Sequence, residues 1–266
     1  MTIWEYNQQS AEKEFVNRAF GSSACVFCGE PLIVLTELRE GLPSAGEYFH
    51  SPVREQSTHT CPICGWWNVR RRDTYAGSSH GVSTSSGAAG TLRQLDLTNI
   101  ETPLDAIRSY LAARYAERFD MAPQLFEETV ASVFRDLGFS ARVTAYSGDG
   151  GIDIVLDGPS DAMIGVQVKR YKGTIKVEQI RAFTGALVVA GLTRGIFVTT
   201  STFQRGVNPL VDRLSTIGYG IDLVDATRFY DALKIAQRSR YRYVDDPTAA
   251  YTNAPLIELG TAYGTY

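Results

Sequence analysis

The segment from Gly148 to Tyr171 constrains the fold more than any other part of this sequence. Two runs of alternating apolar residues flank a short Gly-Pro-Ser-Asp turn, and this pattern predicts a β-hairpin. Asp153 falls near the start of the first strand, while Gln167 and Lys169 are two residues apart on the second and therefore share one face. A carboxylate, an amide oxygen and an ammonium group on paired strands indicate a metal-dependent site for phosphodiester chemistry.

The length and composition of the chain are those of a folded protein with one large or two modest domains. It has 266 residues, of which 44% are hydrophobic, so a sizeable core is expected and global disorder is not. Because the formal net charge is −3, contact with nucleic acid has to come from local basic patches. No apolar run reaches the length of about 18 residues that a membrane span needs. The N-terminal residues also lack the apolar core of a signal peptide, so we expect a cytoplasmic protein without membrane contact.

The four cysteines form two Cys-x-x-Cys pairs, each followed by glycine: Cys25 with Cys28, and Cys61 with Cys64. Two such turns are typical of a zinc ribbon, in which four thiolates surround one Zn²⁺ and leave no open position. The gap between the pairs exceeds the usual spacing of roughly 15–20 residues, but it has room for a strand over Leu32 to Leu38. We therefore predict a structural zinc site, because free cysteines or a redox pair explain poorly why the motif occurs twice.

The order of the patterns predicts two domains and a tail. Residues 1–100 form a small zinc-binding module, in which the Gly/Ser-rich stretch from Gly77 to Gly90 is expected to be a flexible loop. Residues 101–240 form an α/β domain whose elements after residue 120 follow the order α-β-β-β-α-β-α-β-α. This order favours a mixed sheet flanked by helices. Residues 241–266 are expected to be a C-terminal tail or a strand added elsewhere.

Hydrolysis of a phosphodiester requires a divalent cation, a positioned water and a stabilised leaving oxygen. Mg²⁺ prefers oxygen ligands, so Asp153 is the natural first ligand. Glu127 lies at the margin of the apolar face of a helix predicted to begin around Pro123, and it can approach if that helix packs over the hairpin. Gln167 would supply a neutral oxygen or position a water, and Lys169 would orient the attacking water and stabilise the transition state.

A local excess of positive charge follows the second strand of the hairpin. It consists of Arg170, Lys172, Lys176 and Arg181, and we expect the DNA backbone to lie there. The loop from Thr199 to Thr202 is also expected near DNA, although its hydroxyls are more typical of helix capping. For the three arginines that follow Val69, contact with phosphate and a solvated edge are equal alternatives.

Several separated motifs occur in order along the second domain. They are Phe126-Glu127, Gly148-Asp-Gly-Gly-Ile-Asp153, Gln167-Val-Lys169-Arg-Tyr, Ile180-Arg-Ala-Phe-Thr-Gly-Ala and Phe197-Val-Thr-Thr-Ser-Thr-Phe. Together they resemble the catalytic domain of the Mrr-like restriction endonucleases, a branch of the PD-(D/E)xK nuclease superfamily. The resemblance covers roughly residues 105–235 and implies a restriction-endonuclease-like fold with metal-dependent DNA cleavage.

The same resemblance implies the roles of four residues. It assigns Mg²⁺ ligation to Asp153 and Glu127, and the catalytic Gln-x-Lys pair to Gln167 and Lys169. Glutamine in place of the superfamily's usual acid is normal for this branch. Since it removes one negative charge, metal binding without DNA is expected to be weak.

Taken together, these features favour a DNA endonuclease with two modules. The zinc module would recognise or hold a binding partner, with a partner protein as one candidate, and the second domain would hydrolyse the phosphodiester with Mg²⁺. From the family resemblance alone we expect a role in restriction or phage defence, and a homodimer because breaking both strands needs two active sites. Two other hypotheses stay open: a catalytically silent DNA-binding or partner-docking protein, and a structure-selective nuclease that acts on junctions or damaged DNA.

Overall fold

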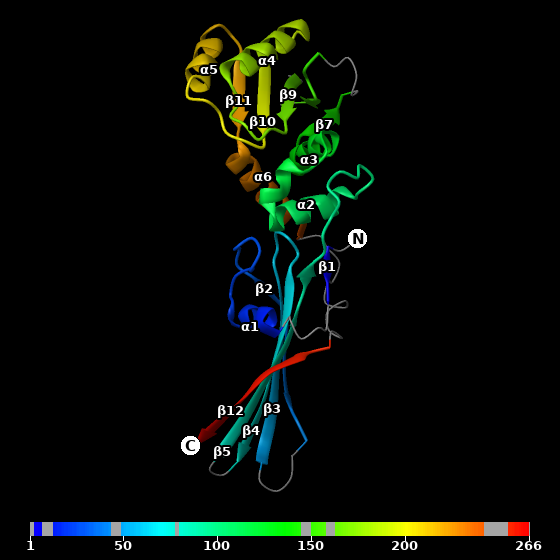
Figure 1. The fold of residues 1–266 in the computed structure, drawn as a ribbon, viewed down its shortest axis with the longest axis vertical. Coiled ribbons are helices and arrows are strands. Elements are labelled where there is room, and N and C mark those ends of the chain that lie inside the picture. The colour runs from blue at the N-terminus through cyan, green and yellow to red at the C-terminus, as the bar shows by residue number, and fades with distance from the viewer. Residues whose placement is uncertain are drawn as a thin grey trace. The chain divides into compact units, whose positions relative to one another are not determined.

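The fold was analysed in a computed structural model that describes residues 3–6, 13–43, 49–77, 80–144, 150–157, 163–241 and 255–265. The chain divides into two compact units (Figure 1). The helical unit comprises Leu95–Arg240, and the strand unit comprises Thr2–Gln94 together with Tyr241–Tyr266. The boundary therefore lies a few residues before the one expected from the sequence, and the strand unit is built from both ends of the chain.

The helical unit has the order of elements that its hydrophobic periodicity predicts. After a first helix, α2 (Leu104–Ala113), and a 3-10 turn, η2 (Tyr115–Phe119), the order α-β-β-β-α-β-α-β-α is confirmed. The elements are α3 (Pro123–Asp136), β7 (Ser140–Val143), β8 (Ile154–Asp157), β9 (Met163–Lys169), α4 (Val177–Val189), β10 (Arg194–Thr199), α5 (Val207–Thr216), β11 (Gly220–Val224) and α6 (Ala226–Tyr241). Among the described residues, no helix combines the length and apolar character that crossing a bilayer requires.

These strands form one mixed sheet with the order β11-β10-β9-β8-β7. The first three strands along the chain, β7, β8 and β9, pair antiparallel, and β9, β10 and β11 pair parallel. The predicted hairpin is present as β8 and β9, with Ile154 opposite Val166. A mixed sheet of this kind, flanked by helices, is the restriction-endonuclease-like architecture expected from the sequence.

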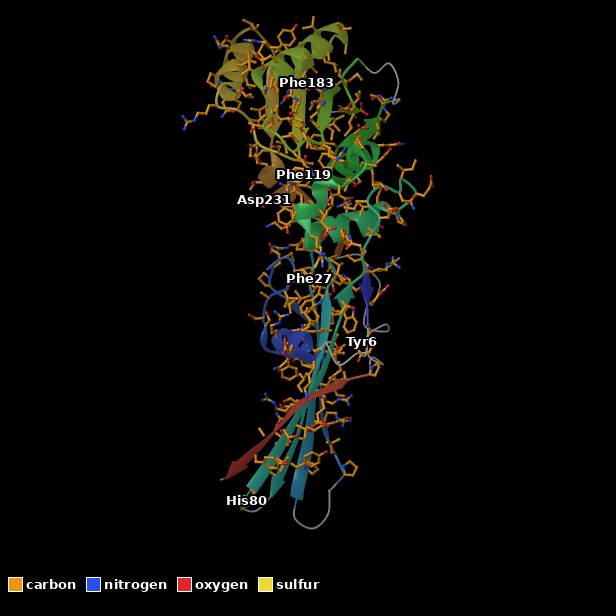
Figure 2. The ribbon with its side chains drawn as sticks, in the orientation of Figure 1. Tyr6, Phe27, His80, Phe119, Phe183 and Asp231 are labelled. Carbon is orange, nitrogen blue, oxygen red and sulfur yellow. The ribbon has the colours of Figure 1, made fainter. Side chains whose placement is uncertain are left out.

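A hydrophobic core between the sheet and α4 and α5 fixes the parallel half of the sheet. Phe183 and Leu187 of α4 pack with Phe197 of β10 and Val207 of α5, and all four side chains are buried. The rings of Phe183 and Phe197 meet edge to face with centroids 5.7 Å apart, and Phe183 is labelled among these side chains in Figure 2. Because α3 lies against β7 and β9, a helix also supports the antiparallel half.

The strand unit is a five-stranded antiparallel sheet with the order β12-β5-β4-β3-β2. Its strands are β2 (Ile33–Gly41), β3 (Phe49–Thr60), β4 (Trp67–Gly77), β5 (His80–Ala89) and β12 (Ile257–Thr265), and α1 (Lys13–Gly21) contacts β4, β5 and β12. The short strands β1 (Trp4–Glu5) and β6 (Thr91–Leu92) pair separately.

One sequence expectation for this unit needs correction, and the structure decides between two others. The Gly/Ser-rich stretch from Gly77 to Gly90 is not a loop, since most of its described residues form β5, which pairs with β4 and β12. Of the two alternatives for residues 241–266, the added strand is confirmed, because Ile257–Thr265 adds β12 to the sheet. In both cases hydrogen bonds to neighbouring strands override a composition that alone has little preference for strand.

One buried charge links two helices of the helical unit. Arg108 of α2 has no exposed side-chain surface, and its Nη1 lies 2.6 Å from Asp136 Oδ2 at the end of α3. Among the described residues, its Nε and Nη2 atoms have no hydrogen-bond partner. Burial lowers the pKa of Arg108, while Asp136 opposes that shift. The carboxylate of Asp136 is therefore the group that makes this buried guanidinium tolerable.

We predict that Asp136→Ala destabilises the helical unit by about 3–5 kcal/mol, because it leaves a buried charge unpaired. Arg108→Met should cost much less, since it removes the charge and keeps most of the volume. Loss of far-ultraviolet circular dichroism on heating follows the helices, whereas all three tryptophans lie in the strand unit and report it separately by fluorescence. Equal destabilisation by both variants would contradict this role of Asp136.

Candidate active site and cysteine cluster

Asp153 is held at the point where β8 begins to pair with β9. Its backbone N–H donates to Val166 O at 2.8 Å, and its carboxylate Oδ2 accepts from the backbone N–H of Val168 at 2.6 Å. On the other side, Thr144 N–H donates to Asp153 O at 2.9 Å. The side chain thus takes the place of a backbone acceptor just before the first ladder pair. The half-buried carboxylate is therefore held by a main-chain contact from β9, while the backbone of Asp153 is held by Val166 and Thr144.

Gln167 and Lys169 lie on the same face of β9, as predicted from their spacing. Gly165 belongs to this face as well, and a Cβ atom built on it would come within 2.7 Å of Leu187 in α4. Gln167 is half-buried, and its Nε2 would lie 3.7 Å from a Cβ built on Gly151. Lys169 is the last residue of the strand and is exposed to solvent.

The turn before β8 brings the main chain next to Gln167 in a backbone conformation that favours glycine. Gly150 has a φ of 61° and Gly151 a φ of 92°. Residues with a side chain rarely adopt such φ values, so this turn requires glycine at both positions. The turn leads into Asp153 and passes close to the Gln167 amide. Residues 145–149, including the expected supporting group Asp149, lie outside the described part of the chain.

Glu127 enters this region from a different element. It is half-buried on α3, and α3 lies against β7 and β9. The helix that carries the second acid therefore packs on the strand that carries Gln167 and Lys169, which is the packing the sequence argument required. Joint binding of one metal ion by Glu127 and Asp153 stays a prediction.

Two buried threonines fix the end of β9, and sequence reasoning missed this role. Thr199 Oγ1 donates to Lys169 O at 3.0 Å, and Thr200 N–H donates to the same carbonyl at 3.2 Å. Thr200 Oγ1 donates to Tyr171 O at 3.1 Å and accepts from Tyr171 N–H at 2.9 Å. Arg118 Nε secures Thr200 O at 2.9 Å. These hydroxyls had been expected at phosphate or at a helix cap. The available signal was that they follow an apolar strand segment, Gly195 to Val198, whose residues are all buried.

The basic residues after β9 divide into one internal and three exposed groups. Arg170 is half-buried and donates from Nη1 to Phe119 O, so its guanidinium links the segment after β9 to the end of η2. Lys172, Lys176 and Arg181 are exposed at or near the start of α4. Lys172 and Arg181 each approach a carboxylate, at 3.8 and 3.9 Å. Such exposed pairs are weak, so all three side chains can turn towards a phosphate backbone, and contact with DNA stays a prediction.

The four cysteines of the strand unit come together although two long strands separate the pairs. Their sulfur atoms all lie within 4.8 Å of one another. Cys25 Sγ is 3.6 Å from Cys64 Sγ, and Cys28 Sγ is 3.4 Å from Cys61 Sγ, so the contacts are not disulfides. Tetrahedral Zn²⁺ with Zn–S bonds of about 2.3 Å places its sulfurs about 3.8 Å apart. The cluster has the ligand type, number and spacing that fit zinc.

Both Cys-x-x-Cys turns have the same backbone geometry. Gly29 N–H donates to Cys25 O at 2.9 Å, and Gly65 N–H donates to Cys61 O at 3.0 Å. Phe27, which is labelled in Figure 2, lies between Cys25 and Cys28 in the sequence, and its ring is 6.1 Å from that of the fully buried Trp66. Aromatic packing therefore joins the two cysteine turns. Burial raises the pKa of Cys64, whereas the hydrogen bond with Cys25 lowers that of Cys28.

We predict that Thr200→Val destabilises the helical unit by about 1–3 kcal/mol, because two backbone groups of Tyr171 lose their partner. Thr200→Ser keeps the hydroxyl and serves as the matched control. The measurement is thermal unfolding followed by far-ultraviolet circular dichroism. If the serine and valine variants are equally destabilised, the loss of stability comes from altered packing, and the hydrogen bonds of the Thr200 hydroxyl do not contribute to stability.

We also predict that the purified chain carries about one Zn²⁺ and that a strong chelator changes tryptophan fluorescence. Trp66 and Trp67 follow directly after the second cysteine pair, so they report the loss of metal. Cys61→Ser should lower the zinc content measured by elemental analysis, while Ser57→Ala, on the same strand unit, should not. Substoichiometric zinc in a protein with native fluorescence would contradict the site.

Two comparisons with known proteins cover the helical unit. The Mrr_cat restriction endonuclease family matches residues 119–233, which include all four proposed active-site residues. The type IV methyl-directed restriction enzyme EcoKMrr of Escherichia coli (strain K12) is 31% identical over 137 residues, which is 48% of this chain and 44% of that enzyme. The match thus spans less than half of the relative's length, and the strand unit lies outside the matched family region. Both findings support an Mrr-like nuclease domain in this part of the chain.

Proposed function

We propose that the chain is a Mg²⁺-dependent DNA endonuclease that acts in restriction. The observation that carries this proposal is the fixed carboxylate of Asp153, placed beside the strand on which Gln167 and Lys169 share a face. The similarity to the restriction endonuclease family and to a restriction enzyme supports a nuclease role over residues 119–233. The metal, the roles of individual residues and the substrate are our inference.

The donor set fits a hard divalent cation. Asp153 offers a carboxylate that the main chain holds in place, and the half-buried Gln167 offers an amide oxygen. Glu127 would supply the second carboxylate from α3. When bound, Mg²⁺ supplies a positive charge that neutralises the phosphate and favours ionisation of a bound water.

The protein's own groups would orient the reactants. Thr199 and Thr200 secure the backbone of Lys169, so its exposed side chain extends from a fixed point at the end of β9. In that position it would orient the attacking water and donate to a phosphate oxygen as negative charge develops. Gln167 would accept from or donate to the same water, since its amide lies beside the Gly151 turn.

We further propose methylated DNA as the substrate and a role in defence against foreign DNA. This rests on the printed description of EcoKMrr as a methyl-directed restriction enzyme. A homodimer would place two such sites across the duplex. The other two functions considered from the sequence, a silent DNA-binding protein and a junction-specific nuclease, are outcomes of the same experiment.

The test is cleavage of methylated and unmethylated plasmid DNA with Mg²⁺ by the full-length chain. We expect Lys169→Ala and Asp153→Asn to lower the cleavage rate about 100-fold or more, because each removes a group that acts on the reacting phosphate. Lys13→Ala, an exposed lysine of α1, is the matched control and should leave the rate unchanged. Both active-site variants should melt at the wild-type temperature.

Three results would contradict the proposal. Wild-type cleavage rates in Lys169→Ala or Asp153→Asn would show that the substituted residue has no catalytic role. DNA binding without cleavage by the wild type would favour the silent protein. Cleavage of branched DNA, but of neither plasmid, would favour the structure-selective nuclease.

A further inference from the structure

The strand unit has a hollow of about 460 Å³ beside the last turn of α1. Phe20 of α1 forms part of its wall, and residues of β2, β3 and β4 form the rest. Four arginines but only two glutamates line it. In a chain with a formal net charge of −3, this is a local excess of positive charge.

The strand register places five of the six charged residues of the hollow in two rows across the sheet. Glu37, Ser57 and Arg70 lie opposite one another in one row. Arg39, Glu55 and Arg72 lie opposite one another in a second row, two residues further along each strand. Residues opposite one another on antiparallel strands point to the same face, and so do residues two apart on one strand. All six side chains of these two rows therefore belong to one face of the sheet. The sixth charged residue, Arg71, lies in the row between them on the other face and donates from Nε to Gln56 Oε1 at 2.9 Å.

Arg70 is held in place by neutral partners. Its Nε donates to Asn68 Oδ1 at 3.0 Å, and its Nη2 donates to Ala19 O at 3.3 Å and also to Ser22 O. Asn68 is itself buried. Because these acceptors are neutral, they do not neutralise the guanidinium, and its positive charge can attract an external anion. Because the side chain is already fixed, little side-chain entropy is lost when the anion binds.

The remaining charges of the hollow favour an anionic partner. Glu55 already approaches Arg39, with Nε and Oε1 3.6 Å apart. Arg72 is exposed, and among the described residues no carboxylate lies within ion-pair distance of Arg70 or Arg72. Arg70 and Arg72 are thus available to an external anion, and Arg39 can join them because its exposed pair with Glu55 is weak.

A second hollow of about 270 Å³ also has Phe20 in its wall. Ser83 and Ser85 of β5 line it, and because Ser85 is paired with Arg72, both hydroxyls lie on the face of the arginines. None of the residues that line this hollow is acidic. Hydroxyl groups and arginines are the side chains that commonly donate to phosphate and sugar oxygens. Because Phe20 belongs to the walls of both hollows, their hydrogen-bond donors form one continuous track: Arg39, Arg70 and Arg72 in the first hollow, and Ser83 and Ser85 in the second. The combined volume of the hollows exceeds that of one small anion.

We propose that this track is a second DNA-binding surface, separate from the nuclease site. Arg39, Arg70 and Arg72 bind phosphates of the DNA backbone, and the hydroxyls of Ser83 and Ser85 bind the continuing strand. The surface assigns two of the three arginines after Val69, Arg70 and Arg72, to phosphate contact. It rests on the proposed function only in the choice of DNA as the polyanion.

The test measures DNA binding by the full-length chain in the presence of EDTA, which prevents metal-dependent cleavage. The probes are a fluorescent duplex and one of its single strands, each titrated at several salt concentrations. Arg39→Ala/Arg72→Ala is expected to bind about tenfold more weakly, and the slope of log K against log salt should fall by about 1–2, as for one or two lost phosphate contacts. Arg70 is left unchanged because its contacts also support the fold.

Two further variants make the result specific. Arg18→Ala removes an exposed arginine of α1 that lines neither hollow, and its affinity should stay within about twofold of the wild type. Arg39→Lys/Arg72→Lys keeps the charges and should restore most of the salt slope. Wild-type affinity and slope in the double alanine variant, or an equal loss in Arg18→Ala, would overturn the inference.

The outcome is distinguishable from failure of the proposed function. Lys169→Ala should lose cleavage but keep DNA affinity, whereas Arg39→Ala/Arg72→Ala should lose affinity while its folded nuclease site is intact. If the wild type cleaves no DNA but the double variant still binds more weakly, the second surface stands and only the nuclease proposal fails.

Discussion

The hydrogen bond from the Val168 amide to the Asp153 carboxylate is the contact on which the helical unit's candidate site depends. A side chain that replaces a backbone acceptor at the start of a strand cannot rotate freely, because the sheet sets the position of its donor. It also places a charged group where the ladder between β8 and β9 begins. The arrangement is rigid on both sides, since the same residue's carbonyl accepts from Thr144.

The rest of the helical unit supports this contact from a distance. The core around Phe183 and Phe197 fixes β9 against β10, and the threonine hydroxyls then fix the backbone of Lys169 and Tyr171. A site held in this way needs little reorganisation when charge develops on a substrate. The strand unit is organised around a different constraint, the four sulfur atoms that join the two ends of a long hairpin.

Sequence reasoning succeeded where one segment carries its own signal and failed where the signal lies in a distant partner. The order of helices and strands after residue 120 followed from hydrophobic periods of 3.6 and 2 residues. The zinc site was predicted from the two Cys-x-x-Cys motifs, which are recognisable within a few residues of sequence. The strand β5 was missed because Gly and Ser have little strand preference, and its hydrogen bonds come from β4 and β12. The roles of Thr199 and Thr200 were missed because a hydroxyl has no preferred partner until the strand that receives it is known.

If Asp153 is a ligand of the catalytic metal ion, its loss must weaken metal binding itself. Mn²⁺ has similar ligand preferences to Mg²⁺. It can be titrated into the chain bound to a duplex whose phosphorothioate linkages resist cleavage, and the bound ion can be counted by electron paramagnetic resonance. We expect Asp153→Asn to lose tight Mn²⁺ binding while it still binds the duplex. Equal Mn²⁺ affinity in the wild type and in Asp153→Asn would contradict metal ligation by Asp153.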